Sequence, residues 1–346
     1  CSLNELEESL DVSGFSSLTN LSCADNKLTS LNAAGLSNLC YLDCNGDKLE
    51  TLNVANCTKL ESLNCFANYL TALDVSTCTA LTYLNCDDNE LESLNAGGLS
   101  QLTDLYCSLN KIETLNLSGC SELKYLDCST NKLKSLTVAD PAKLYSLNCY
   151  DNELEYLNLS GCSALTVLSC GSNYLTSLNL KDCPSLKTLG CEINDLETLD
   201  LRYCPDLLDL CCTKNNFTSL DLNSCPGLQV FICNQSDYLK TVNLENCHEI
   251  FQFECYENPA LTSLDLTPSS GSLLHLEIDN NPSLSDLNII DCYGLKEFYC
   301  YDNAALTTLY VYGCDALINL VKSTEPVKAG TVIKYTSDKT GNYFWF

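Results

Sequence analysis

One motif returns along this sequence at a fixed interval of 21 residues. Residues 81–101 read LTYLNCDDNELESLNAGGLSQ, and the following residues begin LTDLYCSLNKIETL. The shared pattern is L-x-x-L-x-C-x-x-N-x-L-x-x-L. Ten regular units start at Leu18, Leu39, Leu60, Leu81, Leu102, Leu123, Leu144, Leu165, Leu186 and Leu207, and longer or final units start at Leu228, Ile250, Leu273 and Leu295. A single unit of this length cannot bury its own apolar face, so the units must stack.

A period of this length is typical of leucine-rich repeats. The segment L-x-x-L-x-C predicts a short strand whose Leu and Cys side chains point inward and whose intervening residues point outward. The return segment is too short for a long helix and predicts short extended stretches. We therefore predict a leucine-rich repeat solenoid, a β-rich member of the α/β horseshoe class. It has about 14 repeats, a parallel concave β-sheet, short extended segments on the convex side and little α-helix.

The repeat pattern sets the expected domains. We predict one solenoid over residues 1–320, in which residues 1–17 are an incomplete leading repeat with Leu10, Val12 and Phe15 in core slots. The register is lost from about Val321, and residues 321–346 have alternating apolar residues and end in YFWF. This segment predicts a β-rich C-terminal cap over the last repeat.

Most of the 26 cysteines fall into two rows that follow the repeat. The first row comprises Cys23, Cys44, Cys65, Cys86, Cys107, Cys128, Cys149, Cys170, Cys191, Cys212, Cys233, Cys255 and Cys300, with Ile278 in the same slot. The second comprises Cys57, Cys78, Cys120, Cys162, Cys183, Cys204, Cys225, Cys247, Cys292 and Cys314, with Leu36 and Leu99 in the same slot. Replacement by Ile or Leu indicates a buried apolar slot, where a free cysteine acts as a small hydrophobe.

These rows predict ladders of reduced thiols. Equivalent atoms on adjacent strands lie about 4.8 Å apart, which exceeds the Cβ separation of about 3.8 Å that a disulfide prefers. A zinc site made from these cysteines would need a C-x-x-C pair or a nearby histidine to complete four ligands, and neither completes such a set in this sequence. We therefore predict no metal site and no cofactor. Cys40 and Cys211 lie outside both rows, and we expect them to be exposed thiols. The asparagine at position nine, replaced by Asp47 and Ser236, predicts a buried amide that bonds the backbone of adjacent repeats.

A 21-residue unit with an internal cysteine row resembles the internalin-type leucine-rich repeat proteins of bacterial surfaces, particularly those with a cysteine ladder. The resemblance covers roughly residues 1–320. It implies a secreted or surface-anchored protein that binds a host or neighbouring-cell component on its concave face. It transfers no ligand, because concave residues vary within that family. If Cys1 is the lipidated first residue, the protein is a surface lipoprotein; the alternative is that residue 1 results from a truncation within a repeat.

The net charge and the absence of catalytic motifs argue against several classes of function. The net charge of −27, without a Lys or Arg cluster, argues against nucleic acid and an anionic membrane surface, and no apolar run approaches the length of a membrane span. The two histidines, His248 and His275, are 27 residues apart, and no nucleophile elbow, phosphate loop or H-E-x-x-H occurs. We therefore predict a protein that is not an enzyme.

Binding is the better supported function. The outward positions three, five and seven of successive strands predict a concave ligand-binding face with the residues Tyr41, Phe66, Tyr83, Asp104, Tyr106, Tyr125 and Tyr150. A second candidate patch contains Tyr256, His275, Tyr299 and Tyr301, beside Glu254 and Glu277. Exposed aromatic side chains on a rigid sheet suit protein hot spots and sugar stacking. They are also good strand formers, so a purely structural role stays open.

The leading hypothesis is a non-catalytic module of a bacterial secreted or cell-surface protein that binds a protein or glycan of a host or neighbouring cell, as a monomer. The first alternative is a structural surface-layer or spacer protein without a specific ligand. A second alternative is a glycan-active enzyme that uses concave carboxylates.

Overall fold

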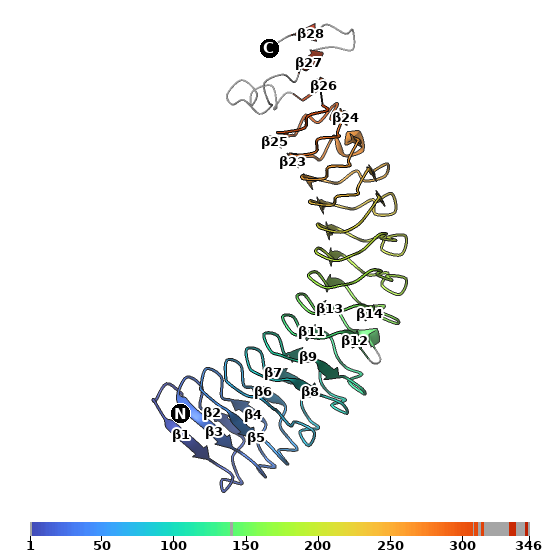
Figure 1. Cartoon of the computed structure of the whole chain (residues 1–346). Helices are drawn as coiled ribbons and strands as arrows, with labels where there is room; N and C mark the ends of the chain where they lie inside the picture. The colour runs from blue at the N-terminus through green and yellow to red at the C-terminus, as the bar shows by residue number, and fades with distance from the viewer. Residues whose placement is uncertain are drawn as a thin grey trace. The chain divides into compact units, whose positions relative to one another are not determined.

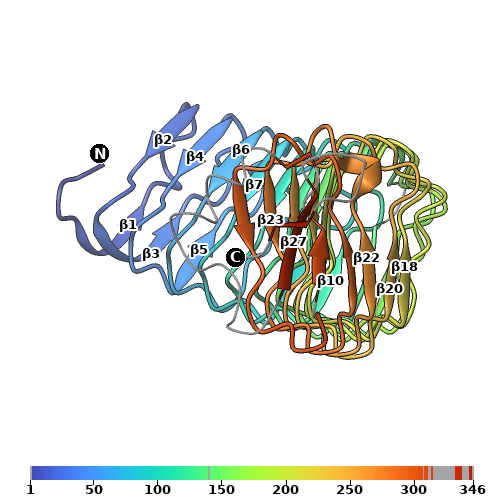
Figure 2. The same ribbon diagram turned by 90° about the horizontal axis from the view of Figure 1, so that it is seen from above.

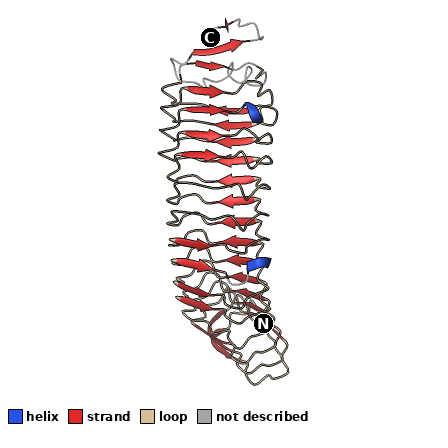
Figure 3. Cartoon of the chain, turned by 90° about the vertical axis from the view of Figure 1, so that its right-hand side faces the viewer, coloured by secondary structure: helices blue, strands red, loops and turns tan. Residues whose placement is uncertain are grey.

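The computed structural model describes residues 2–138, 141–306, 308–310, 313–314, 332–336 and 343–344. The chain forms two compact units, residues 1–174 (unit 1) and 175–346 (unit 2). Each unit is a stack of short coils with strands on two faces (Figures 1 and 3). The only helices among the described residues are two single 3₁₀ turns, η1 (Pro141–Lys143) and η2 (Thr267–Ser269). The fold is a parallel β-solenoid of about 14 turns, as predicted. None of the described helices has the length and apolar character to cross a membrane.

One face of each unit carries a continuous parallel sheet, which we call the main-sheet face. In unit 1 its strands are β2 (Asn20–Ser22), β4 (Tyr41–Asp43), β6 (Ser62–Asn64), β7 (Tyr83–Asn85), β9 (Asp104–Tyr106), β11 (Tyr125–Asp127), β13 (Ser146–Asn148) and β15 (Val167–Ser169). In unit 2 they are β16 (Thr188–Gly190), β17 (Asp209–Cys211), β19 (Val230–Ile232), β21 (Gln252–Glu254), β23 (His275–Glu277) and β25 (Glu297–Tyr299).

The opposite face, the return face, carries the predicted second line of short strands. In unit 1 these are β1 (Glu7–Asp11), β3 (Lys27–Asn32), β5 (Thr51–Asn53), β8 (Ser93–Asn95), β10 (Thr114–Asn116), β12 (Ser135–Thr137) and β14 (Tyr156–Asn158). In unit 2 they are β18 (Ser219–Asp221), β20 (Thr241–Asn243), β22 (Ser263–Asp265), β24 (Asp286–Asn288) and β26 (Thr308–Tyr310). Figure 2 separates the two faces of unit 1: β2, β4 and β6 lie on one side of the coils and β1, β3 and β5 on the other.

The core of each coil consists of the repeat leucines and both cysteine rows. Leu81, Leu84 and Cys86 of one repeat are fully buried, and so are Ile278 and Leu36, which replace a cysteine in their repeats. The prediction of reduced thiols is confirmed for several members of both rows: Cys44, Cys65, Cys86, Cys107, Cys57, Cys78 and Cys120 are buried and free. Cysteine therefore fills space in these slots as a small apolar side chain.

The position-nine asparagine connects each coil to the preceding one, as predicted. Asn89 Nδ2 donates to the carbonyl oxygens of Cys65 (3.0 Å), Cys86 (3.2 Å) and Asp87 (3.1 Å). Asn89 Oδ1 accepts from the amide N–H of Leu70 at 3.0 Å. The buried amide thus satisfies backbone groups in two repeats that no strand partner reaches.

Several positions depart from the sequence-based expectations. Phe15, expected in the core, is 64% exposed. Pro141 and Ser269 occupy the second cysteine slot where η1 and η2 form. Ser269 is fully buried and its hydroxyl donates to the carbonyl oxygen of Cys247. Cys40 and Cys211, expected to be exposed, are half-buried.

Two strands of the predicted cap are described. β27 (Val332–Thr336) pairs in parallel with β26, and β28 (Tyr343–Phe344) pairs antiparallel with β27. Residues 315–331, 337–342 and 345–346 lie outside the described residues, as does Cys1. The domain boundary at residue 320 and the β-rich cap stay predictions.

The thiol ladders predict a labelling pattern. Burial raises the pKa of Cys65 to about 12 and the pKa values of Cys86 and Cys107 well above the usual range. Both burial and the small thiolate fraction suppress alkylation. In the native protein we expect these three thiols to resist iodoacetamide, and in urea we expect all three to react, as mapped by peptide mass spectrometry. Rapid labelling of the native ladder would contradict this packing.

Asp47 offers a stability test, because it stands where other repeats have asparagine. Its Oδ1 accepts from the Leu28 amide at 3.0 Å, but its Oδ2 is buried without a hydrogen-bond partner. We expect Asp47→Asn to raise the free energy of unfolding by about 1–3 kcal/mol, because the new amide can donate to backbone carbonyl oxygens. The midpoint of urea unfolding measures this gain, and Glu50→Gln, which removes an exposed charge in the same repeat, is the control.

The gain in unfolding free energy from Asp47→Asn should depend on pH. Burial raises the pKa of Asp47 above the usual range of an aspartate. A raised folded-state pKa means that the ionised form weakens the folded state, so the penalty is absent below the unfolded pKa of about 3.9 and grows as pH rises through the folded value. The difference between Asp47→Asn and the parent should therefore shrink below about pH 4. A gain that is larger in acid would contradict this account.

Ile193 offers a backbone test. It has a φ of +54° in the turn before a position-nine asparagine, a conformation that is strained for a β-branched residue. We expect Ile193→Asn to stabilise the protein by about 1 kcal/mol, since asparagine tolerates this region. Asp151→Asn, at an equivalent site with a φ of +56°, should change the urea midpoint little. Equal effects of both substitutions would show that strain at Ile193 is not the cause.

Candidate functional site

The in-register sheet of unit 1 places outward side chains in columns. Tyr41, Ser62, Tyr83, Asp104 and Tyr125 follow one another at equivalent positions of β4, β6, β7, β9 and β11. The three tyrosines therefore lie on alternate strands, about 10 Å apart. Polar residues separate them, which leaves the tyrosine rings room to tilt toward their neighbours.

Two pairs of tyrosines form across β7, β9, β11 and the residue just before β13. The rings of Tyr83 and Tyr106 lie 5.7 Å apart at an interplanar angle of 47°, and those of Tyr125 and Tyr145 lie 5.7 Å apart at 59°. Tyr125 and Tyr145 are 40% and 45% exposed, while Tyr83 and Tyr106 are half-buried. We call these four residues with Asp104 the tyrosine patch. Sequence reasoning missed Tyr145, because it occupies position two rather than three, five or seven.

Carboxylates lie between and beside the rings. Asp104 separates Tyr83 from Tyr125 in the column and accepts a hydrogen bond from the hydroxyl of Thr103. Burial, with the Asp104 carboxylate adding to it, raises the pKa of Tyr106. The Tyr106 hydroxyl therefore stays protonated at neutral pH and can donate to a ligand.

Two further aspartates, Asp127 and Asp87, form hydrogen bonds within the sheet surface. Asp127 accepts from the Asn148 amide at 3.0 Å and from the Ser129 hydroxyl at 2.6 Å. Asp87 accepts from the Ser108 backbone N–H at 2.5 Å, and burial raises its pKa to about 6. Because their oxygens bond to neighbouring strands and loops, these two aspartates order the surface under the patch.

The remaining predicted residues lie at its margins. Tyr41 is 38% exposed on β4, and the Ser62 strand separates it from Tyr83. Phe66, also 38% exposed, follows β6, and Tyr150 follows β13 and is half-buried. Phe66 and Tyr150 are therefore far apart on the sheet, because β7, β9 and β11 lie between β6 and β13. The structure thus brings together Tyr83, Tyr106, Asp104 and Tyr125, and leaves Tyr41, Phe66 and Tyr150 around them.

The second predicted patch lies in unit 2 and contains more than aromatic residues. The His275 and Tyr299 rings lie 5.9 Å apart, whereas Tyr256 and Tyr301 occupy the turns that follow β21 and β25. Three carboxylates surround the imidazole: Glu254 and Glu277 on one side and Glu297 on the other. Sequence reasoning missed Glu297, which lies directly opposite His275 on β25. The other histidine, His248, is exposed, and its Nδ1 lies 3.1 Å from the Pro268 carbonyl oxygen.

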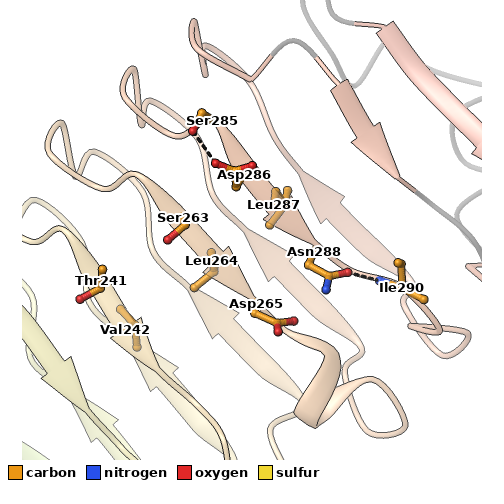
Figure 4. A pocket seen from close by; sticks show the side chains of 10 residues that line it. All are labelled: Thr241, Val242, Ser263, Leu264, Asp265, Ser285, Asp286, Leu287, Asn288 and Ile290. Carbon is orange, nitrogen blue, oxygen red and sulfur yellow. Dashed lines mark hydrogen bonds between the residues drawn. The ribbon is translucent and has the colours of Figure 1, made fainter.

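A groove of about 620 Å³ lies on the return face of unit 2, along β20, β22 and β24 (Figure 4). Val242, Leu264 and Leu287 of its lining are almost fully buried. The two lining carboxylates are held locally: Asp286 accepts from the Ser285 hydroxyl and Asp265 from the Thr267 hydroxyl. Because both carboxylates bond to nearby hydroxyl groups, the described lining of this groove does not bring together side chains that could act as a catalytic site.

The stacked coils, the inward Leu and Cys side chains and the asparagine ladder define a leucine-rich repeat protein. A scan against protein-family models found no match, and a search of curated proteins found none either. The solved structures do contain similar chains. The functional domain of InlJ from Listeria monocytogenes, which includes a cysteine ladder, is 32% identical over 88% of this chain and 67% of that chain, with a TM-score of 0.69.

The chain belongs to the internalin family and is of the cysteine-ladder type. The internalin InlF from Listeria monocytogenes is 23% identical, over 80% of this chain and 75% of that one, with a TM-score of 0.56. YopM from Yersinia enterocolitica is 23% identical, over 90% of this chain and 77% of that one, with a TM-score of 0.60. The last two similarities concern the fold alone.

Proposed function

We propose that this chain is a non-catalytic binding module of a bacterial secreted or cell-surface protein, and that the tyrosine patch engages its ligand. The ligand is a protein or carbohydrate of a host or neighbouring cell. The observation that carries the proposal is the set of two neighbouring tyrosine pairs, with Asp104 between Tyr83 and Tyr125 in the register. Membership of the internalin family supports the location and the binding role.

The patch has the physical properties of a contact surface. Tyrosine offers a large apolar ring and a hydroxyl while losing little side-chain entropy on binding. The strands below the rings are locked by backbone hydrogen bonds on both sides, so the side chains are held in place before a ligand arrives. Asp104 and the net charge of −27 favour a neutral or basic partner.

The chemistry of the patch supports binding rather than turnover. Both histidines of the chain lie in unit 2, so no imidazole accompanies the patch as a general base. Asp87, whose pKa is raised to about 6, accepts a hydrogen bond from the Ser108 backbone and has a structural role at the surface. The monomeric state predicted from the sequence remains part of this proposal.

The test is loss of ligand capture by the double variant Tyr83→Ala/Tyr106→Ala. Truncating two contact tyrosines should weaken binding by roughly 30-fold or more, because hot-spot residues contribute about 1–2 kcal/mol or more each. The measurement is retention on a glycan array and on immobilised host-cell surface proteins, followed by titration of the hit. The array distinguishes a glycan ligand from a protein one.

Tyr156→Ala provides the matched control, because Tyr156 lies on the return face of unit 1 and is 60% exposed. We expect this variant to bind like the parent. Equal retention by the double variant and the control would place the ligand elsewhere, and failure of the parent to capture anything would favour the spacer alternative. Turnover of a glycan library by the parent would instead support the enzyme alternative.

A further inference from the structure

Three side chains of unit 2 converge on one point of the main-sheet face. His275 and Glu277 are two residues apart on β23 and point to the same side, and Glu254 on the neighbouring β21 lies opposite Glu277. The His275 Nε2 atom is 3.9 Å from Glu254 Oε1 and 3.9 Å from Glu277 Oε2. One ligand atom from each residue lies within 4.8 Å of the other two.

The imidazole nitrogen between the carboxylates has no partner. Nε2 of His275 is shielded from solvent and makes no hydrogen bond. Both carboxylate oxygens are too far away for one, since hydrogen bonds to nitrogen span about 2.7–3.2 Å. A shielded nitrogen that faces two carboxylates without bonding to them leaves a site for a cation.

The other imidazole nitrogen is fixed. Nδ1 lies 2.8 Å from Glu297 Oε2, and because an ionised carboxylate only accepts, the Nδ1–H group donates this hydrogen bond. In the neutral ring this leaves the lone pair on Nε2, directed at Glu254 and Glu277. Metal-binding histidines almost always donate their other ring N–H to a carboxylate, a backbone carbonyl or water, and Glu297 provides such an acceptor here.

The two glutamates lie opposite each other with no amide facing either carboxylate across the β21–β23 pair. Elsewhere on the main-sheet face an acid at this strand position faces an amide: Asn64 donates to Asp43 at 3.1 Å and Asn148 donates to Asp127 at 3.0 Å. At β21 and β23 an acid faces an acid, and like charges directly opposite each other destabilise a sheet. Gln252 donates to Glu254 at 2.7 Å, which orients this carboxylate without neutralising it.

We propose that Glu254, His275 and Glu277 form a binding site for a divalent transition-metal ion of the zinc class, with Glu297 as a positioning residue. One imidazole nitrogen and two carboxylates are a suitable donor set for Zn²⁺, Co²⁺ or Mn²⁺. The proposal is independent of the tyrosine patch, which lies in the other unit.

The geometry requires only small movements. Metal–ligand bonds of about 2.0–2.2 Å place neighbouring ligand atoms about 3.3–3.6 Å apart in a tetrahedral site. The observed 3.9 Å separations therefore need to shorten by about half an ångström, which rotations of the two glutamate side chains supply. Three protein ligands leave a coordination position for water or for an oxygen atom of a bound molecule.

The experiment is a Co²⁺ titration of the full, reduced chain, followed by visible absorption and by NMR of the histidine ring protons. The chain has two histidines, so His275 and His248 give two separable signals. We expect saturation at one ion per chain, weak d–d bands, broadening of the His275 signal alone and displacement by Zn²⁺. The double variant Glu254→Gln/Glu277→Gln should lose this response, and Glu297→Gln should weaken affinity by about 10–100-fold.

The control variant Glu245→Gln/Glu249→Gln removes two exposed acids of unit 2 and should bind Co²⁺ like the parent. Without metal, Glu254→Gln/Glu277→Gln should keep its circular dichroism and be at least as stable as the parent, because the carboxylate repulsion is gone. An intense sulfur-to-cobalt charge-transfer band would mean that cysteines bind the ion, and would overturn the proposal. So would undiminished affinity in the double variant, or a His275 signal that reports a doubly protonated ring and ignores the metal.

Discussion

The buried amide of the position-nine asparagine is the interaction on which the stack depends. A coil of 21 residues has backbone groups at its turns that its own strands cannot reach, and Asn89 satisfies three carbonyl oxygens and one N–H across two repeats. Ser236 shows how far the position can vary: its backbone N–H donates a hydrogen bond to Asn258 Oδ1 at 2.9 Å, so the next asparagine still connects the coils. Because each coil is completed by its neighbour, stability is shared along the stack.

The choice of cysteine for the core also has a chemical consequence. A thiol fills the slot that isoleucine fills at position 278, but it can be oxidised in an extracellular setting. Oxidation proceeds through the thiolate, and burial raises the pKa of ladder thiols such as Cys65 to about 12. Half-buried Cys211, whose pKa is raised to about 11 by burial and by Glu192, is protected in the same way. The core packing that places the thiols thus also protects them, so free cysteines are compatible with the proposed surface location.

The repeat period was sufficient to predict the coil, the strand positions, both cysteine rows and the asparagine ladder, because each depends on spacing alone. Spacing did not predict the exposure of Phe15, or η2, where buried Ser269 stands in the second cysteine slot. The candidate sites were predictable only in part. The repeat places Tyr83 and Tyr106 on neighbouring strands, in diagonal positions from which their rings meet. The Tyr125–Tyr145 pair could not be predicted, because Tyr145 is at position two and its ring contact depends on side-chain conformation.

In-register parallel stacking sets a rule for the outer faces. Every surface position becomes a column with a neighbour about 4.8 Å above and below, so like charges repel and large rings collide unless other residues alternate with them. The column Tyr83–Asp104–Tyr125 and the amide that faces Asp127 follow this rule. The Glu254–Glu277 pair breaks it, beside an imidazole whose inner nitrogen has no partner. In a chain built from nearly identical coils, a local exception of this kind costs stability in every molecule, and binding a cation there would offset the cost.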